Sequence, residues 1–135
     1  MFLLDTNVVS ELRHRPPDPR VASWYSKVET SAMFISVLTL GEIKCGADRL
    51  SRKDPDRHRA IMRWLDLLQD IYRERVFDVD RTVAMAWGYL NAARTRPVVD
   101  GLLAATALVH DLTLVTRNVR DFAGTNVPVI NPWEP

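Results

Sequence analysis

The chain alternates between short apolar runs and longer amphipathic stretches. Five apolar runs are too short for helices and end at turn residues, which is typical of buried strands; they are 2–4, 32–37, 76–79, 112–116 and 127–130. Between them, apolar residues recur at helical spacing and predict helices over 7–14, 19–29, 40–50, 54–75, 81–96 and 98–111. This alternation predicts an α/β fold in three layers, with a mainly parallel central sheet of four to five short strands and helices on both faces.

Polar residues at the element boundaries supply start and stop signals. Asp80 directly precedes the helix predicted over 81–96 and is suited to cap it. Thr39, followed three residues later by Glu42, forms a capping-box pattern at the start of the helix predicted over 40–50. The prolines of "RPPDP" at 15–19 end the first helix, because proline cannot continue it.

Composition sets limits on the class of protein. A chain of 135 residues with 47% hydrophobic and 26% charged residues is expected to form a single domain over 1–135 that buries its core without disulfides. The formal net charge is +1, so any phosphate-binding surface must be local. The single cysteine cannot form an internal disulfide, and no apolar run is long enough for a signal peptide or membrane span. We therefore expect a cytoplasmic protein with no membrane partner.

Three carboxylates lie within otherwise apolar stretches: Asp5 in "FLLD", Glu42 in "VLTLGEI" and Asp100 in "VVDGLLAAT". Each taken alone fits a helix cap or a first-turn acid, because carboxylates are favoured at helix starts. Taken together they indicate a cation site, since carboxylates gathered at one edge of a parallel sheet repel one another. Oxygen ligands without histidine or cysteine favour Mg²⁺ or Mn²⁺ over zinc.

Four segments carry a family resemblance, in the order "LLDTNVVSEL", "SVLTLGEIKCG", "VVDGLLAATAL" and "LTLVTRNVRDF" followed by "VINPW". Together they resemble PIN-domain proteins, and are similar to VapC-type toxins of type II toxin–antitoxin pairs, nearest to the FitB-like branch. The resemblance runs over essentially the whole chain. It implies a PIN-like domain and an Mg²⁺- or Mn²⁺-dependent endoribonuclease that cuts RNA with a metal-activated water.

The resemblance also implies roles for particular residues. Asp5, Glu42 and Asp100 correspond to acidic metal-site residues, and the Thr116 hydroxyl links the fourth strand to the site. Thr6 and Asn7 shape the first turn, with Asn7 bracing the loop.

Asn118 departs from the family pattern. Many family members carry an acid in the segment that reads "TRN" here, whereas an amide offers a neutral oxygen and no charge. Asp121 can reach the site if "NVRD" forms a turn, and is otherwise a surface residue. With an amide at Asn118, we expect a metal site that is weaker or that binds one ion rather than two.

Basic and aromatic residues suggest partners. Arg13, Arg15 and Arg117 lie near the motif residues and are candidates for RNA phosphate contacts, whereas the arginines of 49–63 fit a solvated helical face equally well. Trp24 and Tyr25 fit either the core or a groove that receives an antitoxin helix. The family resemblance implies a cognate antitoxin, a homodimer, a heterotetramer or larger complex with that antitoxin, and promoter DNA bound only through it.

Two other functions are compatible with the sequence. Asn118 allows a catalytically weak PIN-fold module that binds RNA or protein without efficient cleavage. An aspartyl phosphotransferase with Asp5 as its nucleophile is less well supported, because "DTN" lacks a second acid two residues on.

Overall fold

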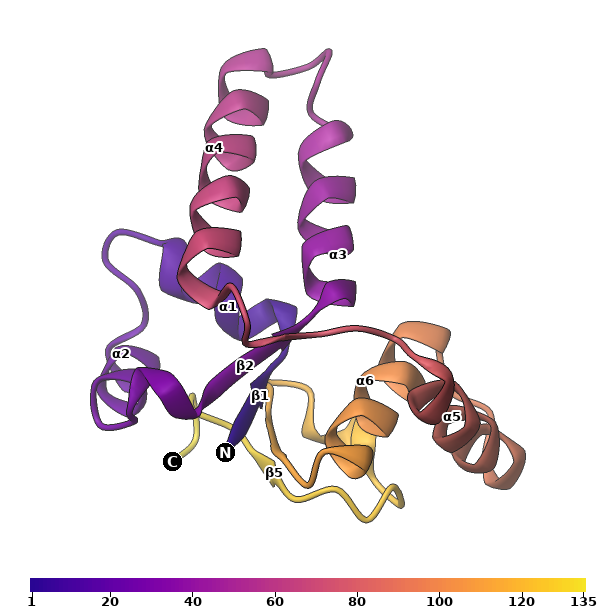
Figure 1. Cartoon of the computed structure of the whole chain (residues 1–135). Coiled ribbons are helices and arrows are strands. Elements are labelled where there is room, and N and C mark those ends of the chain that lie inside the picture. The colour runs from indigo at the N-terminus through magenta and orange to yellow at the C-terminus, as the bar shows by residue number, and fades with distance from the viewer.

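The computed structural model describes residues 1–135 and contains one five-stranded parallel sheet flanked by helices (Figure 1). The strands are β1 (Phe2–Leu4), β2 (Met33–Ser36), β3 (Val76–Phe77), β4 (Thr113–Val115) and β5 (Val129–Ile130). Their order across the sheet is β3-β2-β1-β4-β5, and every neighbouring pair is parallel. The predicted α/β class and parallel sheet are thereby confirmed.

Six α-helices and two short 3₁₀ helices connect the strands. They are α1 (Thr6–Arg13), α2 (Pro19–Ser26), η1 (Thr30–Ala32), α3 (Val37–Asp48), α4 (Pro55–Tyr72), α5 (Arg81–Ala93), α6 (Val98–Val109) and η2 (Val119–Phe122). Helices α3 and α4 form an antiparallel pair that projects from the rest of the chain (Figure 1). At the far end of this pair, His58 of α4 lies 2.8 Å from the Ala47 carbonyl of α3.

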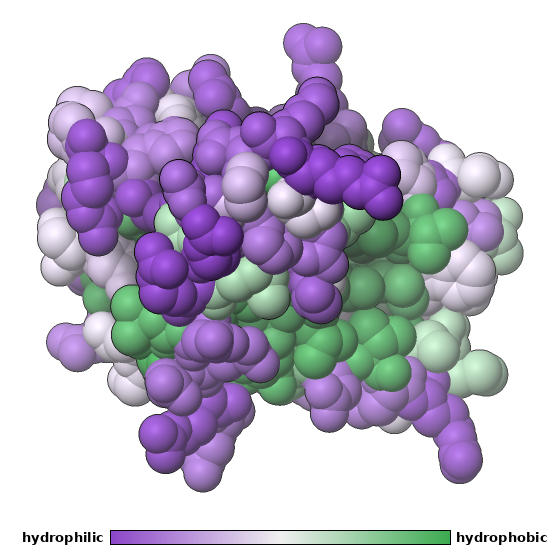
Figure 2. Space-filling view, turned by 90° about the horizontal axis from the view of Figure 1, so that it is seen from above, coloured by the Kyte–Doolittle hydropathy of each residue, from purple (hydrophilic) through white to green (hydrophobic).

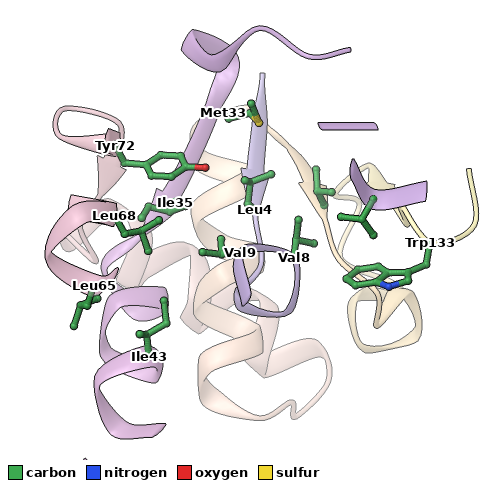
Figure 3. Packing of buried hydrophobic residues seen from close by; sticks show 12 residues of the cluster. Leu4, Val8, Val9, Met33, Ile35, Ile43, Leu65, Leu68, Tyr72 and Trp133 are labelled. Atoms are coloured by element: carbon green, nitrogen blue, oxygen red, sulfur yellow. The ribbon is translucent and has the colours of Figure 1, made fainter. Parts of the chain in front are cut away.

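Alternation of side chains along the strands divides the core into two layers. Leu4 of β1 and Val115 of β4 belong to a cluster built with α1–α4, whereas Leu3 and Leu114 belong to a cluster built with α5 and α6. Successive residues of a strand point to opposite faces, so the continuous apolar runs feed both layers. Figure 3 shows the first cluster, in which side chains of α1, α3 and α4 surround the sheet residues. The predicted three-layer arrangement is confirmed.

The start of α3 differs from the prediction. The helix begins at Val37 rather than near residue 40, and its N-cap is Ser36, whose hydroxyl accepts from the backbone N–H of Leu38. Thr39 is already inside the helix and fully buried. The prediction that Thr39 and Glu42 form a capping box was therefore wrong. Because Ser36 ends β2 and also starts the helix, the side chains of Thr39 and Glu42 are available for other contacts.

The other elements lie in the predicted segments, although α2, α4 and α5 each end three residues earlier than predicted and β3 and β5 have only two residues each. Asp80 caps α5 by accepting from the N–H of Val83, as expected.

Leu68 and Tyr72 of α4 are buried, whereas Ile71 is 47% exposed. Trp24 packs edge-on against Phe2 with ring centroids 5.4 Å apart, and both it and Tyr25 are half-buried against the core. No helix combines the length and the apolar character that a membrane crossing requires.

Candidate active site

The site lies where the order of strands along the chain reverses. The chain runs from β1 outward through β2 to β3 and then crosses back to β4 on the other side of β1. In parallel α/β sheets, functional groups gather beyond the carboxyl ends of the strands at such a point. Leu4 pairs with Val115, so the next residues, Asp5 and Thr116, emerge side by side.

Asp5 is both the N-cap of α1 and the central carboxylate of the site. Its Oδ1 accepts from the backbone N–H of Thr6 at 2.7 Å, and its Oδ2 accepts from the hydroxyl of Thr116 at 2.8 Å. Burial raises the pKa of Asp5, the hydrogen bonds from Thr116 and Thr6 oppose that rise, and the charges of Glu42 and Asp100 add to it. The carboxylate is therefore held rigidly where its charge is unfavourable without a counterion.

Thr116 is the polar hub at the end of β4 and is fully buried. Its hydroxyl donates to Asp5 and accepts from Asn7 Nδ2 at 3.3 Å and from the backbone N–H of Asn118 at 3.1 Å. Asn7 Oδ1 in turn accepts from the backbone N–H of Arg117 at 3.4 Å. Asn7 thus joins the first turn of α1 to the loop after β4, the bracing position expected of it.

Glu42 reaches the site from α3 through the hydroxyl of Thr6. The Thr6 Oγ1 lies 2.6 Å from Glu42 Oε1 and 3.1 Å from Thr39 Oγ1. A hydroxyl has one hydrogen and a carboxylate oxygen accepts, so Thr6 donates to Glu42 and accepts from Thr39. Thr39 is a site residue that the sequence pattern misassigned, because its spacing to Glu42 also matches a capping box.

Asp100 stands in the first turn of α6, on the other side of the sheet. Burial raises its pKa, and the charges of Asp121 and Glu42 raise it further. The next residue, Gly101, allows the indole of Trp87 to pack directly on the helix backbone. A Cβ there would lie 2.9 Å from Trp87 Cδ1, closer than van der Waals contact allows.

Asn118 and Asp121 belong to the turn after β4. Residues 119–122 form η2, in which the N–H of Asp121 donates to the carbonyl of Asn118 at 3.1 Å. Both side chains are exposed, and that of Asn118 does not cap the helix. The turn that was expected to bring Asp121 toward the site is therefore present. The charge of Asp121 contributes to the raised pKa of Asp100.

The residues fit a hard divalent cation. Asp5 follows β1, and Glu42, Asp100 and Asp121 stand on α3, α6 and η2. The charges of Glu42 and Asp100 contribute to the raised pKa of Asp5, and that of Asp121 to the raised pKa of Asp100. No group of three or more His, Cys, Asp or Glu side chains is drawn together tightly enough to enclose a metal ion. Mg²⁺ keeps several waters and binds through one or two carboxylates plus substrate phosphate, so this open arrangement suits it.

The three arginines expected to contact RNA lie in different environments. The Cζ atom of Arg13 lies 5.5 Å from the ring centroid of Trp64. Arg13 also lines a cleft of about 290 Å³ together with Thr6 and Glu42. The guanidinium of Arg15 donates to the carbonyls of Leu12 and His14 at the end of α1. Arg117 lies over the ring of Trp133 at 5.1 Å.

The cleft beside Glu42 also contains two residues that were not singled out for the site. Arg57 and Trp64 of α4 face it together with Ile61. Their spacing of four and three residues places them on one helical face. That periodicity could have grouped them, but only the α3–α4 packing brings their face to Glu42.

The fold and the carboxylates at the switch point define the class of protein. A family model described as the PIN domain matches residues 2–126. The chain belongs to the PIN-domain family.

Named relatives extend over the full chain. The chain is 31% identical over 140 aligned residues to the toxin FitB of Neisseria gonorrhoeae, and the alignment covers 98% of this chain and 99% of FitB. It is also 31% identical over 141 residues to the VapC ribonuclease Y4jK of Sinorhizobium fredii, covering 100% and 99%. Among solved structures, FitAcB from Neisseria gonorrhoeae is similar with a TM-score of 0.90 at 28% identity over 100% of both chains. DNA-bound VapBC from Salmonella typhimurium is similar with a TM-score of 0.74 at 28% identity over 97% of each.

Proposed function

We propose that this protein is a metal-dependent endoribonuclease and the toxin of a type II toxin–antitoxin pair. The observation that carries the proposal is the buried carboxylate of Asp5 at the switch point of the sheet, held by Thr116 and by Thr6, whose hydroxyl also binds Glu42. Relatives of the same length are named as a toxin and as a VapC ribonuclease. A group of carboxylates that can hold a divalent cation suits hydrolysis of a phosphodiester.

Asp5, Glu42 and Asp100 would hold Mg²⁺ or Mn²⁺, with Asp121 within reach as a further acid. When bound, the ion would supply a polarised phosphate oxygen and an activated water at neutral pH. Thr116 and the N–H of Thr6 fix both oxygens of Asp5, and the hydroxyl of Thr6 fixes Glu42. These hydrogen bonds orient the carboxylates before substrate arrives, so no reorganisation is needed during the reaction.

RNA would reach the carboxylates along the cleft lined by Arg13, Arg57 and Trp64. Arginine binds phosphate through its fixed fork of N–H donors, and such contacts position a strand without reading its sequence. Arg117, on the other side of Asp5 along the sheet, would contact the phosphate beyond the cleavage point. Arg15 is the weakest of the three candidates because its guanidinium already caps α1.

The test is cleavage of total RNA by the purified, antitoxin-free protein with Mg²⁺, with Mn²⁺ and with EDTA. We expect cleavage that depends on the metal and disappears with EDTA. Cleavage that persists in EDTA, or in both Asp5→Asn and Asp100→Asn, would contradict the metal mechanism.

A second candidate function rests on Asn118, which is exposed at the site and carries no charge. A PIN-fold module that binds RNA or protein with weak turnover would gain activity from Asn118→Asp, which adds an acid beside Asp121. Robust cleavage by the wild type, unchanged or lowered by this substitution, would exclude the binding module.

The proposed partners follow from the solved complexes and from the surface. The similar structures are described as FitAcB and as DNA-bound VapBC, and we propose a cognate antitoxin, promoter DNA bound through it, and action in the cytoplasm. The view from above Figure 1 shows a hydrophobic area bordered by hydrophilic side chains (Figure 2). Separately, Met85 and Tyr89 of α5 are 73% and 75% exposed. Apolar surface of this kind suits pairing into a homodimer and a heterotetramer or larger complex.

A further inference from the structure

Arg96 is a buried arginine without a carboxylate partner. It lies in the connection between α5 and α6, is only 8% exposed, and takes part in none of the ion pairs of the protein. Its Nε is one of two buried side-chain polar atoms without a hydrogen-bond partner; the other is Nε1 of Trp87. Both belong to residues that flank the first turn of α6, where Asp100 stands.

The guanidinium of Arg96 contacts the end of α5 and the turn after η2 through three backbone carbonyls. It donates from Nη2 to Ala123 at 2.9 Å, and from Nη1 to Leu90 at 3.3 Å and to Arg94 at 3.4 Å. Leu90 is in the last turn of α5, whereas Ala123 directly follows η2. A planar fork of donors can hold carbonyls from several directions, whereas an ammonium cannot reproduce that geometry.

The bond to Ala123 joins the stretch of chain that runs from Arg96 to Asp100 with the turn that carries Asp121, and both acids belong to the proposed site. Asp100 is four residues after Arg96, and the intervening Pro97 is the N-cap of α6 with its backbone held by the proline ring. Asp121 is two residues before Ala123. Movement of Arg96 would therefore be transmitted through short, stiff stretches of chain to both carboxylates.

The far side of this contact is itself rigid. Thr125 is buried, and its hydroxyl donates to the Phe122 carbonyl at 2.7 Å and accepts from the N–H of Val127 at 3.3 Å. Gly124 has φ +79°, in the left-handed region that favours glycine. The Ala123 carbonyl is thus presented to Arg96 by a fixed turn.

We propose that Arg96 is a positioning residue that sets the distance between the Asp100 carboxylate and the turn carrying Asp121. This inference rests on the proposed metal-dependent function, because it assigns Arg96 a role in the geometry of that metal site. It accounts for an arginine buried among backbone carbonyls, where an apolar residue would avoid the cost of burying a charge.

The experiment compares Mn²⁺ binding by full-length, antitoxin-free wild type and Arg96→Lys, following the electron paramagnetic resonance signal of free Mn²⁺. We expect Arg96→Lys to bind Mn²⁺ about tenfold more weakly, the lower end of the loss on removing groups that orient metal ligands. Amide hydrogen exchange should become faster at residues 98–101 and 118–124. Thr125→Val, which loosens the other side of the contact, should weaken binding in the same direction and serves if Arg96→Lys does not fold.

Arg75→Lys is the matched control. The guanidinium of Arg75 also donates to backbone carbonyls, those of Thr30, Met33 and Ile71, but it lies at the opposite end of the strands. We expect it to lower stability without changing Mn²⁺ affinity. The positioning role would be overturned if Arg96→Lys bound Mn²⁺ as tightly as the wild type does. It would also be overturned if Arg75→Lys lost as much Mn²⁺ affinity as Arg96→Lys. A wild type that binds no Mn²⁺ would contradict the proposed function instead, and unchanged exchange at 118–124 in Arg96→Lys would then overturn the inference by itself.

Discussion

At the scale of single residues, Asp5 shows how one side chain serves both the fold and the proposed chemistry. It caps α1 and ends β1, yet it is buried beside other acids and its pKa is raised. A raised pKa means that the folded chain binds the proton more tightly than the unfolded chain does. The stability of the fold therefore falls as pH rises from the ordinary aspartate range through the folded pKa, and the full cost remains at neutral pH.

Asp5→Asn is expected to raise the melting temperature at neutral pH and to lower RNA cleavage strongly. Asparagine is an equally good N-cap and removes the buried charge. Activity should fall at least about a hundredfold, because a bound metal supplies several kcal/mol of transition-state stabilisation and each 1.36 kcal/mol is tenfold. Thermal unfolding followed by circular dichroism, together with RNA cleavage, measures both effects.

Asp48→Asn is the control for that prediction. The hydrogen bond from Lys44 lowers the pKa of Asp48, so its ionised form is favoured in the folded chain, and its loss should not raise the melting temperature. If both substitutions lower the melting temperature, burial of charge at Asp5 is not the dominant effect.

Thr116→Val is expected to lower stability by about 1–3 kcal/mol, because the buried hydroxyl that pairs with Asp5 and with the Asn118 N–H is lost. RNA cleavage should fall as well, since Asp5 loses a contact that orients it. Urea denaturation measures the stability change. In Thr106→Val, by contrast, only a hydroxyl bond to the Leu102 carbonyl in its own helix disappears, so stability should change little and cleavage should be retained.

At the scale of the elements, the approach of α5 to α6 determines where Asp100 stands. Trp87 of α5 occupies the space that a side chain at 101 would need, so glycine follows Asp100 for a packing reason. Residues 98–109 nevertheless remain helical, because α6 is buried between the sheet and α5 and packing outweighs the low helix propensity of one glycine.

Gly101→Ala is expected to destabilise the protein by about 1–3 kcal/mol through overpacking against Trp87, despite the better helix propensity of alanine. It should also lower RNA cleavage, because relief of the clash shifts the turn that bears Asp100. Gly88→Ala on α5 is the control, since nothing lies within 4 Å of a Cβ there, and it should stabilise by about 0.5–1 kcal/mol. Equal stabilisation by both substitutions would show that the indole moves aside freely.

At the scale of the whole molecule, a net charge of +1 leaves little long-range attraction for RNA. Affinity should then depend on a few local arginines. For single-stranded RNA, the slope of log affinity against log salt is about −0.7 per phosphate contact.

We expect Arg13→Gln and Arg117→Gln, each made in the inactive Asp5→Asn chain, to reduce that slope by about 0.7. Arg15→Gln should have a smaller effect, because its guanidinium caps α1. Fluorescence anisotropy with a labelled RNA oligonucleotide over a salt series measures the slopes. Slopes unchanged by Arg13→Gln and Arg117→Gln would place the RNA on another surface.

The sequence by itself determined the class of fold and the order of its elements. Continuous apolar runs of a few residues are typical of strands in a parallel sheet covered on both sides, so residues 2–4 and 112–116 were recognisable as buried strands. Acids in apolar frames such as Asp5 and Asp100 were recognisable for the same reason, because a lone buried charge is costly. Local signals also located the caps at Asp5 and Asp80.

Only the tertiary structure decided which polar groups meet. The capping-box spacing of Thr39 and Glu42 is a local pattern, and the prediction failed because the helix already begins after Ser36. The side chains of Thr39 and Glu42 instead form hydrogen bonds with Thr6, more than 30 residues away in the sequence. Arg96 gave no local signal at all, since its partners are 27 residues away at Ala123 as well as nearby in α5. Contacts between distant segments depend on how the layers pack, and one-dimensional periodicity records which face a residue occupies but not what lies opposite it.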